Sequence, residues 1–263
     1  MKSPYFLPLF ITVLILLGMS SKKEDIPLGT VPLKKNLYID ATEMSNLDWR
    51  TYMYWIKEKY GSNSEEYKQT LPDTTVWNHP LLEAYQKTYL RHPAFNDCPV
   101  VGITYEQAIG YCKWRTDLEN EYIYIEKNKL KFHPDSIYKN IPKTYEFRLP
   151  TPEEFERAAR IKFKPSIQKK IDKDEYNTCN CRFEEEEEYH LQSITSPVES
   201  YFPNESGIYN LIGNVAEMTS VRGIAKGGSW MHYLDEIKIK EYNMYSKPQN
   251  WLGFRCVCVR LQN

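Results

Sequence analysis

Hydrophobic and polar positions along the chain predict two long helices before residue 130. Apolar side chains recur at helical spacing over residues 47–56, and the polar segment 42–46 before them provides the cap. Around Thr104 the pattern is a capping box, in which its hydroxyl accepts from the first turn while Gln107 reaches back. A third, shorter helix is expected after Thr151, which is followed by a proline and two glutamates.

Short apolar runs predict strands at residues 37–40, 99–103, 225–227 and 254–261. Residues 61–97 contain prolines and little periodicity, so an ordered loop is expected there. The segment 161–196 is rich in lysine and then in glutamate, which is typical of a solvated loop; calcium binding by the glutamate run 184–188 is the alternative. No internal repeat or interdomain linker is visible. We therefore predict a single loop-rich α+β domain over residues 34–263.

The first 19 residues are typical of an export signal or an N-terminal anchor. A lysine at position 2 precedes an apolar run that contains Pro8 and is shorter than the roughly 20 residues needed to cross a bilayer. Residues 16–18 begin a pattern similar to a bacterial lipoprotein cleavage box, but Met19 stands where the box requires a cysteine. The segment then stays as an uncleaved anchor, or another peptidase cuts it, or the native residue here is a cysteine. Residues 20–33 are expected to be a linker.

Charge and cysteine content narrow the function. The 263-residue chain has a formal net charge of -1 at pH 7, which argues against nucleic-acid binding and leaves the N-terminal segment as its expected membrane contact. Six cysteines in an exported chain favour disulfides over metal or redox chemistry. Zinc binding by the pairs Cys179/Cys181 and Cys256/Cys258 is disfavoured, because Cys-x-Cys is not a usual zinc spacing.

Four short segments occur in a fixed order at residues 148–160, 213–217, 226–230 and 253–256. Together they resemble the formylglycine-generating-enzyme/sulfatase-modifying-factor family. Segments 37–46 and 98–114 are also similar to parts of that family, so the likeness extends from about residue 37 to residue 260. It implies a formylglycine-generating-enzyme-like variant of the C-type-lectin-like fold. Within it we assign Arg148, Arg160 and Arg255 to buried hydrogen bonding.

The resemblance also implies where a catalytic site would lie. In the family's enzymes, two cysteines between the third and fourth of these segments bind copper and activate oxygen, and such a copper site requires soft thiolates. Between Ser229 and Gly253 this chain has no cysteine, and it offers only Met231, His232 and Met244. A thioether forms neither the disulfide nor the thiolate that the oxidation uses. We therefore expect no copper, no catalytic residues and no formylglycine formation.

Residues 209–217 resemble the calcium loop of those enzymes. The resemblance implies ligands from the side chains of Asn210 and Glu217 and from the backbone carbonyls of Gly213 and Val215. Such an oxygen-only set suits one calcium ion. The alternative is that the loop only shapes a turn, with Asn210 and Asn214 bonding to backbone. The family's second calcium loop is not expected in this chain.

The resemblance implies one disulfide as well. Cys112 and Cys256 occupy the family positions of a bridge between a helix and the C-terminal strand. Closing so long a loop stabilises by roughly 4–5 kcal/mol on the chain-entropy model. The remaining cysteines stay unassigned, with Cys98–Cys258 and Cys179–Cys181 as alternatives that the sequence does not rank.

Four further segments are shared with a narrower group. Residues 46–55, 71–77, 89–95 and 114–121 resemble the gliding-motility lipoproteins GldJ and GldK of Bacteroidota. Those proteins carry the fold as non-catalytic parts of the type IX secretion and gliding machinery, at the periplasmic face of the outer membrane. The likeness implies a non-catalytic cell-envelope protein that binds envelope or secretion-machinery proteins. The alternatives are an enzyme with altered chemistry and a lectin-like module that binds a small ligand or glycan.

Overall fold

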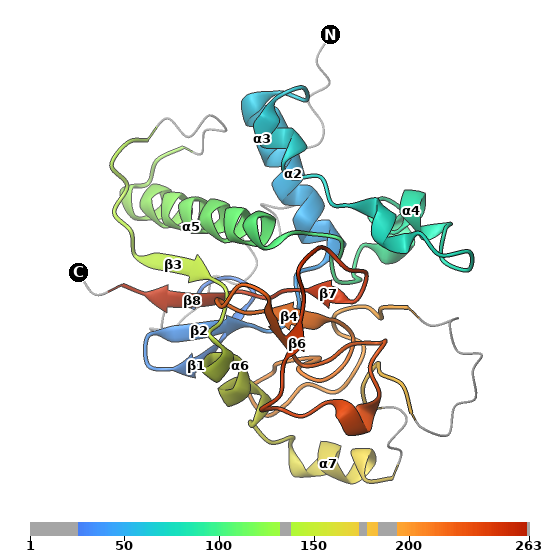
Figure 1. Ribbon diagram of the computed structural model, residues 1–263. Helices are drawn as coiled ribbons and strands as arrows, with labels where there is room; N and C mark the ends of the chain where they lie inside the picture. The colour runs from blue at the N-terminus through green and yellow to red at the C-terminus, as the bar shows by residue number, and fades with distance from the viewer. Residues whose placement is uncertain (1–25, 132–137, 174–177, 184–193, 262–263) are drawn as a thin grey trace.

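The computed structural model describes residues 26–131, 138–173, 178–183 and 194–261 (Figure 1). The predicted export segment, residues 1–19, and the glutamate run 184–188 lie outside these ranges. In the part of the chain that is described, no helix is both long enough and apolar enough to cross a membrane.

Two four-stranded sheets form the centre of the molecule. The first has antiparallel neighbours in the order β1 (Thr30–Lys34), β2 (Leu37–Asp40), β8 (Val257–Arg260) and β3 (Tyr145–Arg148). The second has the order β6 (Asn243–Met244), β5 (Ile224–Lys226), β4 (Ala216–Met218) and β7 (Leu252–Gly253), and in it β4 and β7 pair in parallel. Because β2 pairs directly with β8, the two ends of the described chain meet in one sheet.

The three predicted helices are present as α2 (Asn46–Tyr60), α5 (Tyr105–Asn128) and α6 (Pro152–Ala159). The cap expected within residues 42–46 is Ser45, which forms a complete capping box with Asp48. The predicted capping boxes at Thr104 and Thr151 are also complete. Local side-chain hydrogen bonds therefore set the start of each long helix, as the sequence indicates.

The first sheet lies between two helices, with α5 above it and α6 below it in Figure 1. Side chains alternate across the strands, so Tyr38 and Cys258 pack with residues of α2 and α5. Leu37, Ile39 and Val257 face the other way and pack with Phe155 and Ala158 of α6. This alternation buries both faces of the β2–β8 pair and confirms the predicted mixed α and β single domain.

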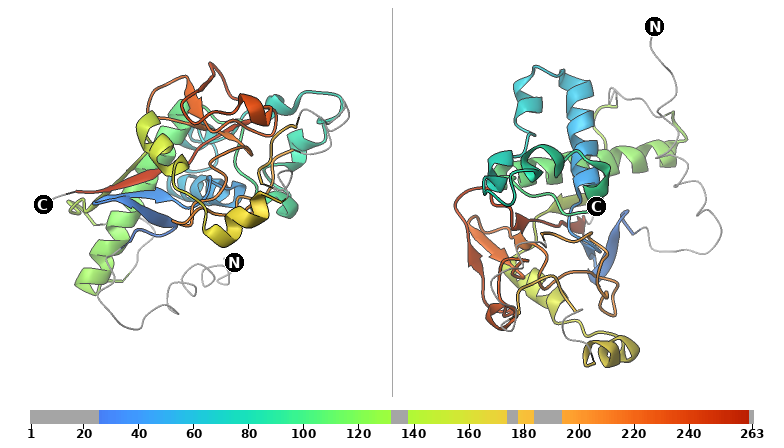
Figure 2. Two further views of the ribbon diagram at one scale, coloured as in Figure 1. Left: turned by 90° about the horizontal axis from the view of Figure 1, so that it is seen from below. Right: turned by 90° about the vertical axis from the view of Figure 1, so that its right-hand side faces the viewer.

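The remaining helical segments are short. They are α3 (Glu65–Lys68), η1 (Thr74–Trp77), α4 (Tyr85–Thr88), η2 (Pro93–Phe95), α7 (Pro165–Ile171) and η4 (Leu234–Glu236). Residues 61–97 are thus not a plain loop but a series of single turns, which local caps such as Ser64 and Asp73 begin. Figure 2 shows α2, α3 and α4 at one end of the molecule and α7 at the other.

Two boundary predictions are corrected by the structure. Residues 99–103 are not a strand, although they are largely buried. The only bridge there joins Ser45 to Pro99, and the N–H groups of Val100 and Gly102 donate to loop carbonyls, those of Met44 and Gln249. Gly102, at φ +75°, lies so close to Asp73 that an added Cβ would be 2.5 Å from its carbonyl oxygen, which leaves no room for a regular strand. The predicted linker 20–33 also ends too late, because β1 begins at Thr30.

Candidate functional site

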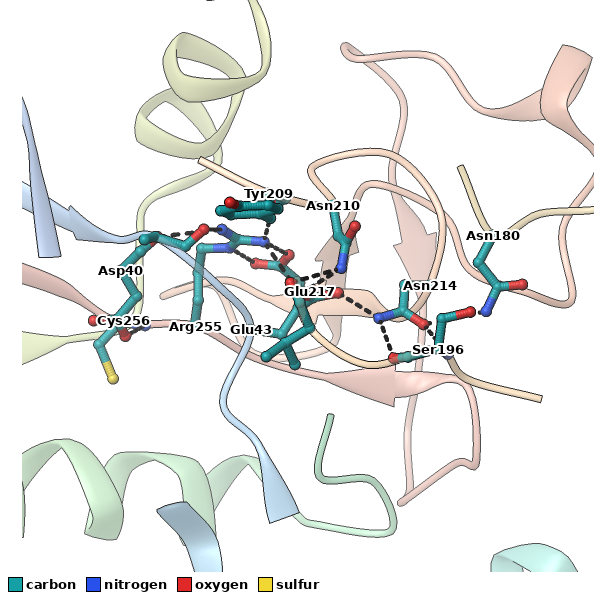
Figure 3. A network of polar contacts seen from close by, with 12 residues as sticks. Asp40, Glu43, Asn180, Ser196, Tyr209, Asn210, Asn214, Glu217, Arg255 and Cys256 are labelled. Carbon is teal, nitrogen blue, oxygen red and sulfur yellow. Dashed lines mark hydrogen bonds and ion pairs between the residues drawn. The ribbon is translucent and has the colours of Figure 1, made fainter. Parts of the chain in front are cut away.

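A buried polar network joins the predicted calcium loop to the rest of the core (Figure 3). Its centre is an ion pair between Arg255 and Glu217, whose side chains are almost completely buried. Arg255 Nε donates to Glu217 Oε2 at 2.6 Å, and Arg255 Nη2 donates to Glu217 Oε1 at 2.6 Å. This two-point geometry matches a planar guanidinium to a carboxylate and is the strong form of such a pair.

The guanidinium also donates to backbone on both sides of the ion pair. Arg255 Nη2 donates to the carbonyl of Tyr209 at 2.9 Å, and Nη1 donates to the carbonyl of Asp40 at 3.2 Å. Arg255 lies between β7 and β8, Glu217 lies in β4, and Asp40 ends β2. One side chain therefore connects both sheets to the loop that precedes β4, which confirms the predicted buried hydrogen bonding for Arg255. The same prediction is wrong for Arg160, whose side chain is 53% exposed, and Arg148, which pairs with Glu154, is 34% exposed.

Two asparagines of the loop hold a second buried carboxylate, that of Glu43. Asn214 Nδ2 donates to Glu43 Oε1 at 2.8 Å, and Asn210 Nδ2 donates to Glu43 Oε2 at 3.1 Å. Both asparagines have positive φ, a conformation that Asn adopts more readily than other non-glycine residues. Sequence reasoning missed Glu43 as a partner because it lies 167 residues from Asn210; its place in the segment similar to the family's entry segment was the available signal.

The same asparagines bond to backbone, as the turn-shaping alternative expects. Asn210 Nδ2 donates to the carbonyl of Val198 at 3.0 Å, and Asn214 Nδ2 donates to the carbonyl of Ser196 at 3.1 Å. On its other side, Asn214 Oδ1 accepts from the Ser196 backbone at 2.8 Å and from Asn180 Nδ2 at 3.2 Å. The loop is therefore fixed at several points without any added group.

Among the predicted calcium ligands, one side-chain atom is free to bind an ion. The side-chain oxygen of Asn210, Oδ1, is buried and has no hydrogen-bond partner, so it is an oxygen donor that an ion would satisfy. Gly213 and Val215 follow in the same loop, but both oxygens of Glu217 already accept from Arg255. An ion at this loop would share Glu217 with Arg255. Within the described ranges, no cluster of three or more His, Cys, Asp or Glu side chains is placed to hold a metal.

Burial changes the acidity of both carboxyl groups. Desolvation raises the pKa of Glu43 to about 8, with Arg255 partly opposing the shift and Glu217 adding to it. Desolvation also raises the pKa of Glu217 above its ordinary value, again opposed by Arg255. One guanidinium thus faces two buried carboxyl groups, and a proton on Glu43 removes the excess negative charge.

In the stretch that would carry the catalytic cysteines, a hydrogen-bonded group of Ser229, His232 and Asn243 is found, which we call the histidine cluster. Ser229 Oγ and His232 Nδ1 lie 2.7 Å apart, and His232 Nε2 lies 2.9 Å from Asn243 Nδ2. Burial lowers the pKa of His232, and its ring meets the Trp251 ring edge-on at 5.4 Å. Both ring nitrogens are thus occupied. Met244, which follows Asn243, is 76% exposed.

The positions of the cysteine sulfurs can be compared with the disulfide pairings expected from the sequence. Cys112 Sγ and Cys256 Sγ are 3.5 Å apart and buried between α5 and the first sheet. The S–S bond of a disulfide is about 2.05 Å long, so the two sulfurs are close neighbours but not at bonding distance. The predicted bridge between them stays a prediction. Cys179 Sγ and Cys181 Sγ are 2.8 Å apart, and Cys98 Sγ lies 4.0 Å from the Thr195 carbonyl.

The raised pKa of Glu43 predicts a specific pH dependence of stability. The folded state keeps the Glu43 proton at pH values where the unfolded chain, with its ordinary value of 4.5, has lost it. The free energy of unfolding should therefore fall as pH rises from about 4.5 to about 8, by an amount on the order of a few kcal/mol. Urea denaturation at a series of pH values measures this slope.

The matched variants are Glu43→Gln and Glu58→Gln, the second being an exposed position on α2. Glu43→Gln should flatten the slope between pH 5 and pH 8, leaving the part that comes from Glu217, whereas Glu58→Gln should leave it unchanged. An equal slope in wild type and Glu43→Gln would show that Glu43 is already ionised at pH 5 in the folded protein.

Comparison with known proteins gives one family and two useful structural neighbours. The model of the sulfatase-modifying factor enzyme 1-like domain matches residues 12–260. The crystal structure of CarF is 16% identical, with a TM-score of 0.52, and covers 86% of this chain and 87% of its own. PvdO from Pseudomonas aeruginosa is 17% identical, with a TM-score of 0.50, and covers 86% of this chain and 80% of its own. At these identities the neighbours show the fold alone, and no curated protein matches the sequence.

Proposed function

Because the chain belongs to the sulfatase-modifying factor enzyme 1-like domain family but lacks a thiol between Ser229 and Gly253, we propose that it is a non-catalytic cell-envelope protein. In this proposal it is a structural or protein-binding component of the gliding-motility and type IX secretion machinery, at the periplasmic face of the outer membrane. The observation that carries the non-catalytic part is the cluster of Ser229, His232 and Asn243, which takes the place of a thiolate pair.

The segments that resemble the gliding-motility lipoproteins support the second part, because they come together in space. They belong to α2, the segment that ends in η1, the α4–η2 region and α5, which we call the helical layer (residues 46–60, 71–77, 85–95 and 105–121). Asn46 Nδ2 donates to the carbonyls of Tyr89 and Phe95 at 3.2 and 3.0 Å. Trp77 packs on Tyr89 with ring centres 4.7 Å apart. Sequence segments with no local reason to occur together thus pack against one another in one part of the fold.

A groove of about 740 Å³ lies between α2, α3 and α5 beside this layer. Tyr52 and Trp114 contribute to its lining, with their ring centres 5.2 Å apart. Its charged lining residues are Lys59, Lys113, Glu66, Glu106, Asp117 and Glu121. Of these, Glu121 is buried and Glu106 pairs with Arg222, so the exposed charges of the groove are of both signs. Aromatic side chains among exposed charges of both signs suit a protein partner that presents apolar side chains with complementary charges around them. We place the contact with an envelope protein here.

Affinity purification from the native envelope, followed by mass spectrometry, tests the partner. The wild-type chain should recover secretion-ring or outer-membrane translocon subunits. Asp117→Lys should lower that recovery severalfold, because it reverses an exposed charge in the groove, and Glu146→Lys makes the same change on exposed β3 and should not. Recovery of the chain alone, together with saturable glycan binding, would instead favour a lectin-like module.

The absence of catalysis has its own test. A sulfatase-type Cys-x-Pro-x-Arg peptide incubated with the protein, copper and oxygen should keep its cysteine, because no thiolate pair is present to bind copper between Ser229 and Gly253. Mass spectrometry of the peptide gives the answer. A loss of mass that matches formylglycine would restore the enzyme interpretation, whatever the purification shows.

We also propose that the loop binds one calcium ion through Asn210, Gly213, Val215 and Glu217. Calcium should then raise the unfolding free energy relative to a chelator, by about 2.7 kcal/mol at a free concentration 100 times its dissociation constant. Asn210→Gly should abolish this increment, because glycine accepts the positive φ but lacks the Oδ1 ligand. Thermal unfolding with calcium and with chelator measures both.

The control for the calcium test is Asn214→Gly. Asn214 also has positive φ and also donates to Glu43, but its side chain is not a predicted ligand, so this variant should keep the increment. Glu217→Ala is uninformative because it leaves the Arg255 charge buried with or without calcium. A wild-type protein whose unfolding does not respond to calcium would contradict the proposed calcium site.

A further inference from the structure

We infer that Cys179 and Cys181 form a disulfide that holds Asn180 against the turn at Gly213 and Asn214. Their Sγ atoms lie 2.8 Å apart, the shorter of the two Sγ–Sγ contacts described in this chain. Residues two apart in a chain have Cα atoms at most about 7 Å apart, which overlaps the span of roughly 4.4–6.8 Å that disulfides bridge. A small rotation of the two side chains therefore closes the bond.

Asn180, the residue between the two cysteines, contacts the turn of the buried polar network, so a disulfide at this place would restrain that turn. The carbonyl of Asn180 accepts from the Asn214 backbone N–H at 2.7 Å, and Asn180 Nδ2 donates to the carbonyl of Ile194 at 2.9 Å. A Cβ at Gly213 would lie 2.6 Å from the Asn180 carbonyl oxygen, so the two backbones are in direct contact. A bond that fixes residues 179–181, which we call the arch, would therefore also hold Asn180 in place beside Gly213 and Asn214 of the buried polar network.

The different exposure of the two thiols determines which of them reacts first when the disulfide forms. Cys181 is partly exposed and Cys179 is buried. With oxidised glutathione as the disulfide oxidant, the Cys181 thiolate attacks one glutathione sulfur and the other glutathione leaves as a thiolate. The Cys179 thiolate then attacks the Cys181 sulfur and releases the second glutathione. Two protein thiols lose two electrons and two protons, and one glutathione disulfide becomes two thiols.

Mass spectrometry of the purified full chain tests the pairing, independently of the proposed envelope role. The tryptic peptide 174–182 contains Cys179, Cys181 and no other cysteine. After treatment with oxidised glutathione and alkylation without reduction, it should be recovered lighter by two hydrogen atoms and without an alkyl group. Two alkyl groups, a retained glutathione, or a link to another cysteine peptide would overturn the inference. Cys112→Ser, which removes the other close pair, should give the same result as wild type.

Hydrogen exchange tests the consequence. The Asn214 amide, bonded to the Asn180 carbonyl, should exchange more slowly after oxidation than before it. Cys181→Ser should remove this difference, while the Phe147 amide of β3, which is bonded to Thr116 of α5, exchanges alike in both proteins. An Asn214 amide that exchanges equally in oxidised and reduced wild-type protein would show that the arch is held without the bond, and the clamping role would be wrong.

Discussion

Complete burial of the Arg255 guanidinium is the constraint on which the surrounding structure depends. A charge removed from water is too costly to leave alone, so a carboxylate must be brought to it. Glu217 meets it through two hydrogen bonds of 2.6 Å from Nε and Nη2. Nη2 also donates to the carbonyl of Tyr209, and Nη1 donates to the carbonyl of Asp40. The end of β2, strand β4 and the segment before β8 are consequently fixed by one side chain. Removing one partner of such a pair typically costs about 3–5 kcal/mol, because the other charge stays buried.

Glu43 makes the centre of the molecule sensitive to its own protonation. Its carboxyl group lies 4.0 Å from the Arg255 guanidinium and accepts from Asn210 and Asn214, but the guanidinium is already bidentate to Glu217. A proton on Glu43 and an ion beside Asn210 Oδ1 are two ways of balancing the same excess charge. The loop that resembles a calcium site thus lies beside a cation of the protein itself, and its two asparagines donate to Glu43.

The helical layer and the polar network are different parts of the molecule and have different roles in the proposed function. The layer is attached to the core through α2, where Trp49 is completely buried, stacks on Tyr111 at 5.8 Å and donates to the carbonyl of Thr70 at 3.0 Å. A rigid base of this kind lets an outer face change its partner without disturbing the fold. The histidine cluster at residues 229–243 is likewise a packed structural element, with both ring nitrogens of His232 held.

The sequence by itself determined the local features of this protein. Capping boxes at Thr104 and Thr151 involve residues three apart, and the α5 and α6 patterns repeat within one or two turns, so a single segment contains all the information. The family followed from motifs that are equally local. The strand prediction for residues 99–103 was wrong because a buried loop segment can have the same apolar composition as a buried strand; its only bridge is at Pro99.

Only the tertiary structure decided which groups meet. Arg255 and Glu217 are 38 residues apart, Asn214 and Glu43 are 171 apart, and Asn180 reaches Asn214 across 34. No periodicity connects such positions, because the pairing of β2 with β8 and the packing of two sheets bring them together. A buried charge takes as its partner whichever carboxylate the packed strands place beside it, and that choice depends on the whole fold.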